Sequence, residues 1–158
     1  MSSASEAALP EGRVALRAGL PWMFIVATGS MKPLLWPGDT VEIRPCPPDQ
    51  LRIGDVICVD ADDELLLHRL VGRPPVQGGP GVLTRGDRCL GPDAPRARED
   101  VLGRAVSVKR GPLAFRIDGR VRAPLFWLAG RLWPLTAPAR AARRGLGRLL
   151  APRRDPQT

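Results

Sequence analysis

The stretch LRIGDVICVDADDELLLHRLVGR, residues 51–73, carries the pattern on which the fold prediction rests. Gly54-Asp55 is a turn dipeptide, and the VICVD segment that follows it has the apolar, β-branched composition of a strand. The acidic loop ADDE then leads into a second apolar segment, LLLHRLV. A turn, a strand, a short loop and another strand in succession predict two antiparallel neighbours in a sheet.

Similar units recur on both sides of this stretch. WMFIVATG (22–29) ends at a turn, Pro37-Gly38-Asp39 precedes alternating residues 40–44, and two further strand patterns follow at 81–93 and 101–111. The 17 Gly and 18 Pro also favour many short elements. We therefore predict a mainly β fold: a compact antiparallel β domain over residues 21–112. Residues 1–20 are expected to be a loose segment or a short helix, and residues 113–158 a basic, amphipathic, partly helical C-terminal tail.

The positive charge is concentrated near the C-terminus. The chain has a net charge of +8, and residues 104–158 hold 13 of its 24 Lys and Arg but only 2 of its 16 Asp and Glu. Phe126, Trp127 and Trp133 lie among these arginines, a mixture that favours contact with an anionic membrane surface. The alternative is that the apolar residues of the tail cover the β domain. No nucleic acid partner is expected, because no recognition motif is evident.

The sequence predicts neither a membrane span nor a metal site. The longest apolar stretch, residues 18–27, is interrupted by Pro21 and is far shorter than the roughly 20 residues that a crossing needs. Glu6 and Glu11 at the start do not fit a secretory signal, so a cytoplasmic or peripheral membrane location is expected. No cofactor and no metal are expected, because the three cysteines lack C-x-x-C spacing and are better explained as thiols that fill core gaps: Cys46, Cys58 and Cys89.

One serine and one histidine are the candidates for chemistry. Ser30 lies in ATGSMKPLLWPGD (27–39), directly after an apolar run, and a serine hydroxyl needs an adjacent base before it can act as a nucleophile. His68 is the only histidine in the chain. It could be that base, or it could be a buried histidine whose hydrogen bonds serve the core alone.

The order of four short motifs resembles the type I signal peptidase family. The motifs lie between Phe24 and Arg110. The first is Thr-Gly-Ser-Met-x-Pro (28–33) together with the Pro-Gly-Asp (37–39) that follows it. The other three are Ile-Gly-Asp-Val (53–56), His-Arg-Leu-Val-Gly (68–72) and Thr-Arg-Gly-Asp (84–87). His68-Arg69 resembles the archaeal and endoplasmic-reticulum-like form, which has histidine where the common bacterial form has lysine. The wider superfamily includes the LexA-type self-cleaving repressors.

The resemblance implies roles for eight residues. It places the nucleophile at Ser30 and the base at His68, with Asp87 and Asp93 as the candidates that assist the imidazole. Thr28, Gly29 and Met31 are implied to bind the oxyanion or the substrate, although Thr28 could be an ordinary strand threonine. Arg69 is expected to support the site, for example by pairing with Asp87, unless it is a solvated strand residue.

The expected function is therefore that of a serine endopeptidase that cleaves an extended peptide or a precursor protein. Membrane-embedded signal peptidases have a transmembrane helix near the serine motif. Because none is evident here, a leader peptide of a cytoplasmic precursor is a candidate substrate. The alternatives are a catalytically inactive β domain that binds a partner or a membrane surface, and a self-cleaving repressor-like domain.

Overall fold

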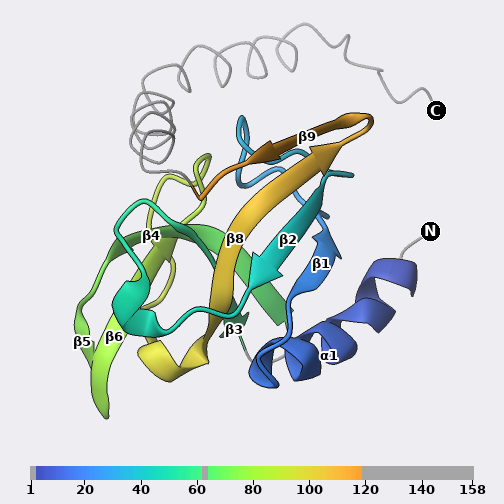
Figure 1. The fold of residues 1–158 in the computed structure, drawn as a ribbon. Coiled ribbons are helices and arrows are strands. Elements are labelled where there is room, and N and C mark those ends of the chain that lie inside the picture. The colour runs from blue at the N-terminus through green and yellow to red at the C-terminus, as the bar shows by residue number, and fades with distance from the viewer. Residues whose placement is uncertain (1–2, 62–63, 119–158) are drawn as a thin grey trace, which may run out of the picture.

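An antiparallel sheet of nine strands is the main structural feature of the part of the chain that the structure describes (Figure 1). The structure is a computed structural model that describes residues 3–61 and 64–118. The elements in chain order are α1 (Ser3–Arg17), β1 (Trp22–Ile25), β2 (Thr40–Arg44), η1 (Pro48–Gln50), β3 (Val56–Ala61), β4 (Glu64–Gly72), β5 (Pro75–Val76), β6 (Gly79–Arg85), β7 (Arg96–Ala97), η2 (Arg98–Asp100), β8 (Val101–Arg110) and β9 (Leu113–Arg116). This architecture confirms the predicted fold class.

The stretch 51–73 forms the hairpin that its sequence predicts. β3 and β4 pair antiparallel from Val56↔Arg69 to Ala61↔Glu64. The strand order is β1-β2-β8-β3-β4-β6-β5, with β7 beside β6 and β9 beside β8. β4 therefore lies between β3 and β6, and β8 joins the β1-β2 pair to the β3-β4 hairpin (Figure 1).

The Gly38-Asp39 and Gly54-Asp55 steps form the expected turns, and they do so by the same means. Both glycines have a positive φ, 91° and 99°, a conformation that side chains disfavour. In both turns the aspartate carboxylate accepts a backbone N–H from three residues earlier, at 2.8 Å from Trp36 and at 2.8 Å from Arg52. Each step is therefore a structural turn that fixes the register of the strand after it.

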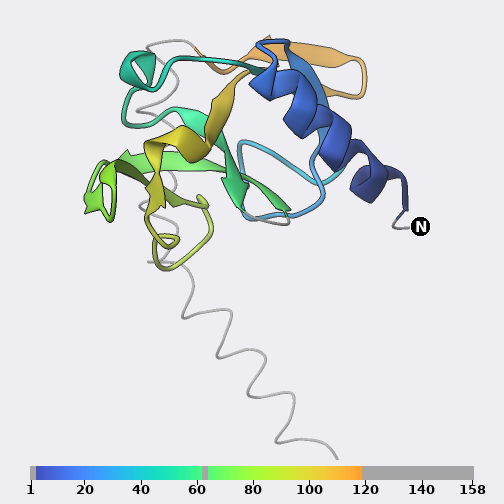
Figure 2. The same ribbon diagram turned by 90° about the horizontal axis from the view of Figure 1, so that it is seen from below.

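The N-terminal segment is more ordered than a loose segment would be. α1 lies beside β1, at the end of the sheet opposite β5 and β6, as Figures 1 and 2 show together. Leu16 is buried in the core, and Arg13 and Arg17 form ion pairs with Asp60 of β3 at 3.0 and 2.7 Å. Tertiary docking thus stabilises this helix. No helix in the described residues is both long and apolar enough to cross a bilayer.

The sheet includes two segments beyond the strand patterns of the sequence. Residues 75–80, which precede the strand pattern at 81–93, contain β5 and the start of β6. The predicted domain limit at residue 112 falls within a hairpin, because β9 pairs with β8 after a turn at Gly111, whose φ is 55°. Ile117 beyond it is buried in the core. The aromatic and arginine-rich part of the tail, from residue 119 on, lies outside the described residues.

Candidate active site

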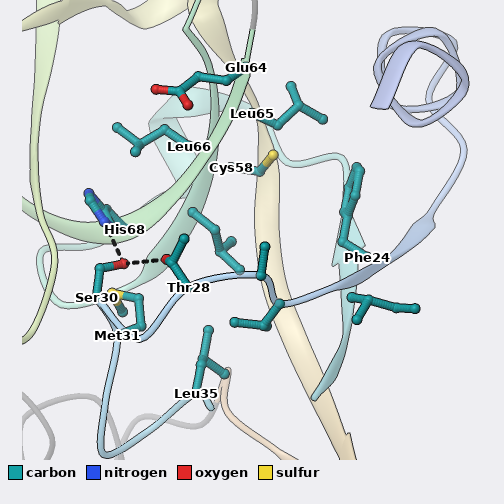
Figure 3. Close-up of a pocket in the computed structure, with 14 residues that line it drawn as sticks. Phe24, Thr28, Ser30, Met31, Leu35, Cys58, Glu64, Leu65, Leu66 and His68 are labelled. Carbon is teal, nitrogen blue, oxygen red and sulfur yellow. Dashed lines mark hydrogen bonds between the residues drawn. The ribbon is translucent and has the colours of Figure 1, made fainter. Parts of the chain in front are cut away.

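Ser30 lies in a turn that follows the end of β1. Its backbone carbonyl accepts the N–H of Arg88 at 2.8 Å, and the next residue, Met31, is buried with 2% of its surface exposed. A buried side chain on one side and a backbone hydrogen bond on the other fix the position of the serine. Its hydroxyl oxygen lies 3.0 Å from His68 Nε2 and 3.3 Å from Thr28 Oγ1 (Figure 3).

His68 comes from the middle of β4 and contacts Ser30 on one side and an acid on the other. Only 7% of its surface is exposed, and its Nδ1 lies 2.8 Å from Asp93 Oδ2. An ionised carboxylate only accepts hydrogen bonds, so Nδ1 is the nitrogen that carries the proton. Nε2 of the neutral ring then has a free lone pair and accepts the hydroxyl proton of Ser30. This is the tautomer that a general base for Ser30 requires.

Asp93 is held in place by Thr84 of β6. The Thr84 hydroxyl donates to Asp93 Oδ2 at 2.6 Å, and the Asp93 backbone N–H donates to the Thr84 carbonyl at 2.8 Å. Ser30, His68, Asp93 and Thr84 thus form one line of hydrogen bonds. Thr84 had no predicted role, although it is the first residue of the Thr-Arg-Gly-Asp motif.

Asp87, the other candidate to assist the imidazole, is engaged elsewhere. Both of its carboxylate oxygens accept from Arg69, with Nε and Nη2 each at 2.7 Å, and both side chains are buried. Arg69 Nη1 also donates to the Gly54 carbonyl at 2.6 Å. The structure therefore brings Asp93 to the imidazole and pairs Asp87 with Arg69, the pairing that was expected for Arg69. This pair ties the end of β4 to the loop after β6.

Gly86 lets that loop pass close to the serine and the histidine. A Cβ atom at this position would lie 3.0 Å from His68 Nε2, 3.1 Å from the Ser30 carbonyl oxygen and 2.7 Å from Cys89 Sγ. Any side chain would collide with the pair or displace it. Gly86 had no predicted role, and only its place in a Gly-Asp step pointed to it.

Two hydrogen-bond donors lie near the Ser30 hydroxyl: the Ser30 backbone N–H and the Thr28 hydroxyl. Within the described residues, no hydrogen bond occupies the Ser30 backbone N–H. Thr28 lies after the last residue of β1, so it is not a strand threonine, and its hydroxyl is 3.3 Å from Ser30 Oγ. A Cβ atom at Gly29, between them, would lie 3.2 Å from Lys32 Cε, so a side chain there would press on that of Lys32. A hydroxyl and a free N–H are the donors that oxyanion stabilisation requires.

An open, mostly apolar cavity of about 250 Å³ begins at Ser30 and His68 and extends between β4 and the residues that follow β1 (Figure 3). Its lining comprises residues 24–28, 30, 31, 35, 58 and 64–68. β4 pairs with β6 only from Arg69 onward, so residues 64–68 have an edge with no strand partner among the described residues. Such an edge can add an extended peptide as a further strand.

The cysteines do not provide a rival nucleophile in this cavity. Burial raises the pKa of Cys58 to about 12, so this thiol stays protonated at neutral pH and fills the core at the cavity wall. Burial likewise raises the pKa of the Cys46 thiol. The described residues contain no cluster of three metal-ligating side chains.

Comparison with known proteins assigns no family. No protein-family model matches the chain, and no curated protein matches it either.

Proposed function

We propose that this protein is a serine endopeptidase in which Ser30 is the nucleophile, His68 the general base and Asp93 the carboxylate that orients the imidazole. The observation that carries the proposal is the continuous hydrogen-bonded line from Ser30 Oγ through His68 to Asp93, at 3.0 and 2.8 Å, at the end of an open cavity. The order of the signal peptidase-like motifs supports the same reading.

The proposed reaction is acyl transfer in two steps. Ser30 Oγ attacks the peptide carbonyl carbon while its proton moves to His68 Nε2, and the Ser30 N–H and the Thr28 hydroxyl stabilise the oxyanion. The C–N bond then breaks, the leaving amine takes the proton from His68, and an ester on Ser30 remains. Water, activated by the same imidazole, hydrolyses that ester and restores the enzyme.

The substrate is proposed to be an extended segment of a peptide or precursor protein. The unpaired edge of β4 at residues 64–68 offers backbone hydrogen-bonding groups beside the dyad. The apolar lining offers burial for alternate side chains of such a strand.

Peptide cleavage by the full-length chain tests this function. A mixture of extended peptides, with leader-like and signal-peptide-like members, is incubated with the unsubstituted protein, with Ser30→Ala and with Ser107→Ala, and the products are read by mass spectrometry. Ser107 is the control, because its hydroxyl donates to Glu42 on β2, away from the cavity. We expect cleavage by the unsubstituted and Ser107→Ala proteins only. Equal cleavage by Ser30→Ala contradicts the proposal, and peptide binding without cleavage by any protein supports the inactive binding module instead.

We also propose that the basic segment after β9 contacts an anionic membrane surface. The excess of arginine over acids from residue 104 onward is the observation behind it. Flotation with anionic and with neutral vesicles at low salt tests this contact. We expect the protein to float with the anionic vesicles alone, and protein that stays unbound by them overturns it.

A further inference from the structure

Glu64 is the acidic side chain at the cavity wall. It is the first residue of β4 and is exposed, while His68 lies four residues further along the same strand. Side chains two residues apart in a strand share a face, and Figure 3 shows Glu64, Leu66 and His68 on one side of β4 and Leu65 on the other. The carboxylate therefore lies on the same face as the imidazole.

The Glu64 carboxylate has no partner among the residues that the structure describes. No hydrogen bond or ion pair within residues 3–61 and 64–118 involves it. Asp60, the neighbouring acid in β3, differs, because Arg13 and Arg17 of α1 neutralise it and leave its side chain 11% exposed. An unpaired carboxylate beside an apolar cavity is available to a cation that a ligand brings.

We infer that Glu64 selects a lysine or arginine in the bound peptide, a specificity that rests on the proposed endopeptidase function. A strand rises about 3.3 Å per residue, so Glu64 lies roughly 13 Å along β4 from His68. An extended peptide beside β4 has the same rise. The selected basic residue is therefore about four residues from the cleaved bond, with the apolar cavity between them.

The expected preference is modest and salt-dependent. Exposed ion pairs in proteins favour the paired state by about two- to fivefold. A Glu64→Lys substitution replaces attraction by repulsion, so it should reverse the preference and make glutamate the better residue at that position. Raising the salt concentration should reduce both preferences, because the pair is in contact with solvent.

A binding scan tests the inference separately from the proteolysis. The probes are labelled apolar dodecapeptides that carry one lysine, glutamine or glutamate at each position in turn. Their binding to three full-length Ser30→Ala proteins is measured by fluorescence anisotropy. The first protein keeps Glu64, and the other two carry Glu64→Gln or Glu64→Lys. Glu99→Lys is the matched control, because Glu99 is an exposed acid of η2 outside the cavity. The same peptides are offered to the protein with Ser30 intact for cleavage.

We expect lysine peptides to bind about two- to fivefold tighter than glutamine peptides in one register when Glu64 is present. This preference should vanish in Glu64→Gln, reverse in Glu64→Lys and persist in Glu99→Lys. A preference that survives Glu64→Lys, equal binding at every position, or no binding at all overturns the inference. If the peptides are cleaved but show no charge preference, the role of Glu64 is overturned and the endopeptidase proposal stands. If the charge preference is found but no peptide is cleaved, the role of Glu64 is supported and the endopeptidase proposal is overturned.

Discussion

A methyl group at Gly86 should damage the proposed active site although it replaces no reacting residue. The backbone of Gly86 does not have a positive φ, so alanine meets no conformational strain there, and the effect must come from space. The added Cβ would lie 3.0 Å from His68 Nε2 and 3.1 Å from the Ser30 carbonyl oxygen, where ordinary contacts begin at 3.4 Å. The third contact, 2.7 Å from Cys89 Sγ, can be relieved by rotation of that side chain.

The remaining overlap of a few tenths of an ångström has to move the dyad or the loop. The imidazole is held by Asp93, and the Ser30 carbonyl is held by the Arg88 N–H, so neither yields freely. Because a misplacement of about 1 Å costs about 100-fold in rate, we expect kcat/KM for peptide cleavage to fall about tenfold in Gly86→Ala. Overpacking should also lower the free energy of unfolding by about 1–3 kcal/mol.

Kinetics and urea denaturation of Gly86→Ala and Gly91→Ala measure both effects. Gly91 is the matched control, because a Cβ there would have no atom within 4 Å, and its substitution should leave kcat/KM unchanged. Full activity and full stability in Gly86→Ala would refute the close approach of the loop to the dyad.

Three further predictions concern the acid of the site, a core thiol and the half-buried ion pair between Asp39 and Arg110. Asp93→Asn should lower kcat about 1000-fold while circular dichroism shows an unchanged fold, because an amide N–H that faces His68 Nδ1 stabilises the wrong tautomer of the imidazole. Near-normal kinetics would exclude Asp93 as the orienting acid. Cys58, with its pKa raised to about 12 by burial, should resist a thiol reagent at pH 8 until urea unfolds the protein, and labelling of the native state at this position would contradict its burial. A hydrogen bond from Arg110 lowers the pKa of the Asp39 carboxyl in the folded protein. The ionised carboxylate therefore stabilises the fold at pH values above the pKa of an unfolded aspartate, about 3.9. This contribution is lost as the pH falls through the lower pKa of the folded state. Asp39→Asn should therefore lower the free energy of unfolding by about 1 kcal/mol at pH 7 and by less at pH 3, because the Arg110 side chain is partly exposed. Urea denaturation at both pH values measures this, and an equal loss at both would contradict the sign.

The fold was predictable where local chemistry and pairing agree. The Gly-Asp steps at 38–39 and 54–55 need a positive φ and a carboxylate cap, and both requirements are visible in the sequence. The helix over residues 3–17 was only one of two expectations for this segment, because it contains Pro10 and depends on docking to β1 and on ion pairs with a distant strand. The β8-β9 hairpin was missed because its second strand begins the arginine-rich segment that we assigned to the tail.

The site was predictable in its residues but not in all of its pairings. Spacing alone leaves Asp87 and Asp93 equally able to reach His68, because both follow β6 within one loop. The buried guanidinium of Arg69 resolves the choice by taking both oxygens of Asp87. Such competition between partners depends on how β4 and the loop after β6 pack in three dimensions.

The central claim is that Ser30 and His68 act as one catalytic unit, and a double-mutant cycle tests it most directly. The measurement is kcat/KM for cleavage of one peptide by the unsubstituted protein, Ser30→Ala, His68→Ala and the double variant. Residues that share one proton transfer are non-additive, so we predict that each single substitution costs about 1000-fold or more and that the double variant loses no more than either. Losses that multiply in the double variant, or a Ser30→Ala protein that cleaves at the full rate, would contradict the claim.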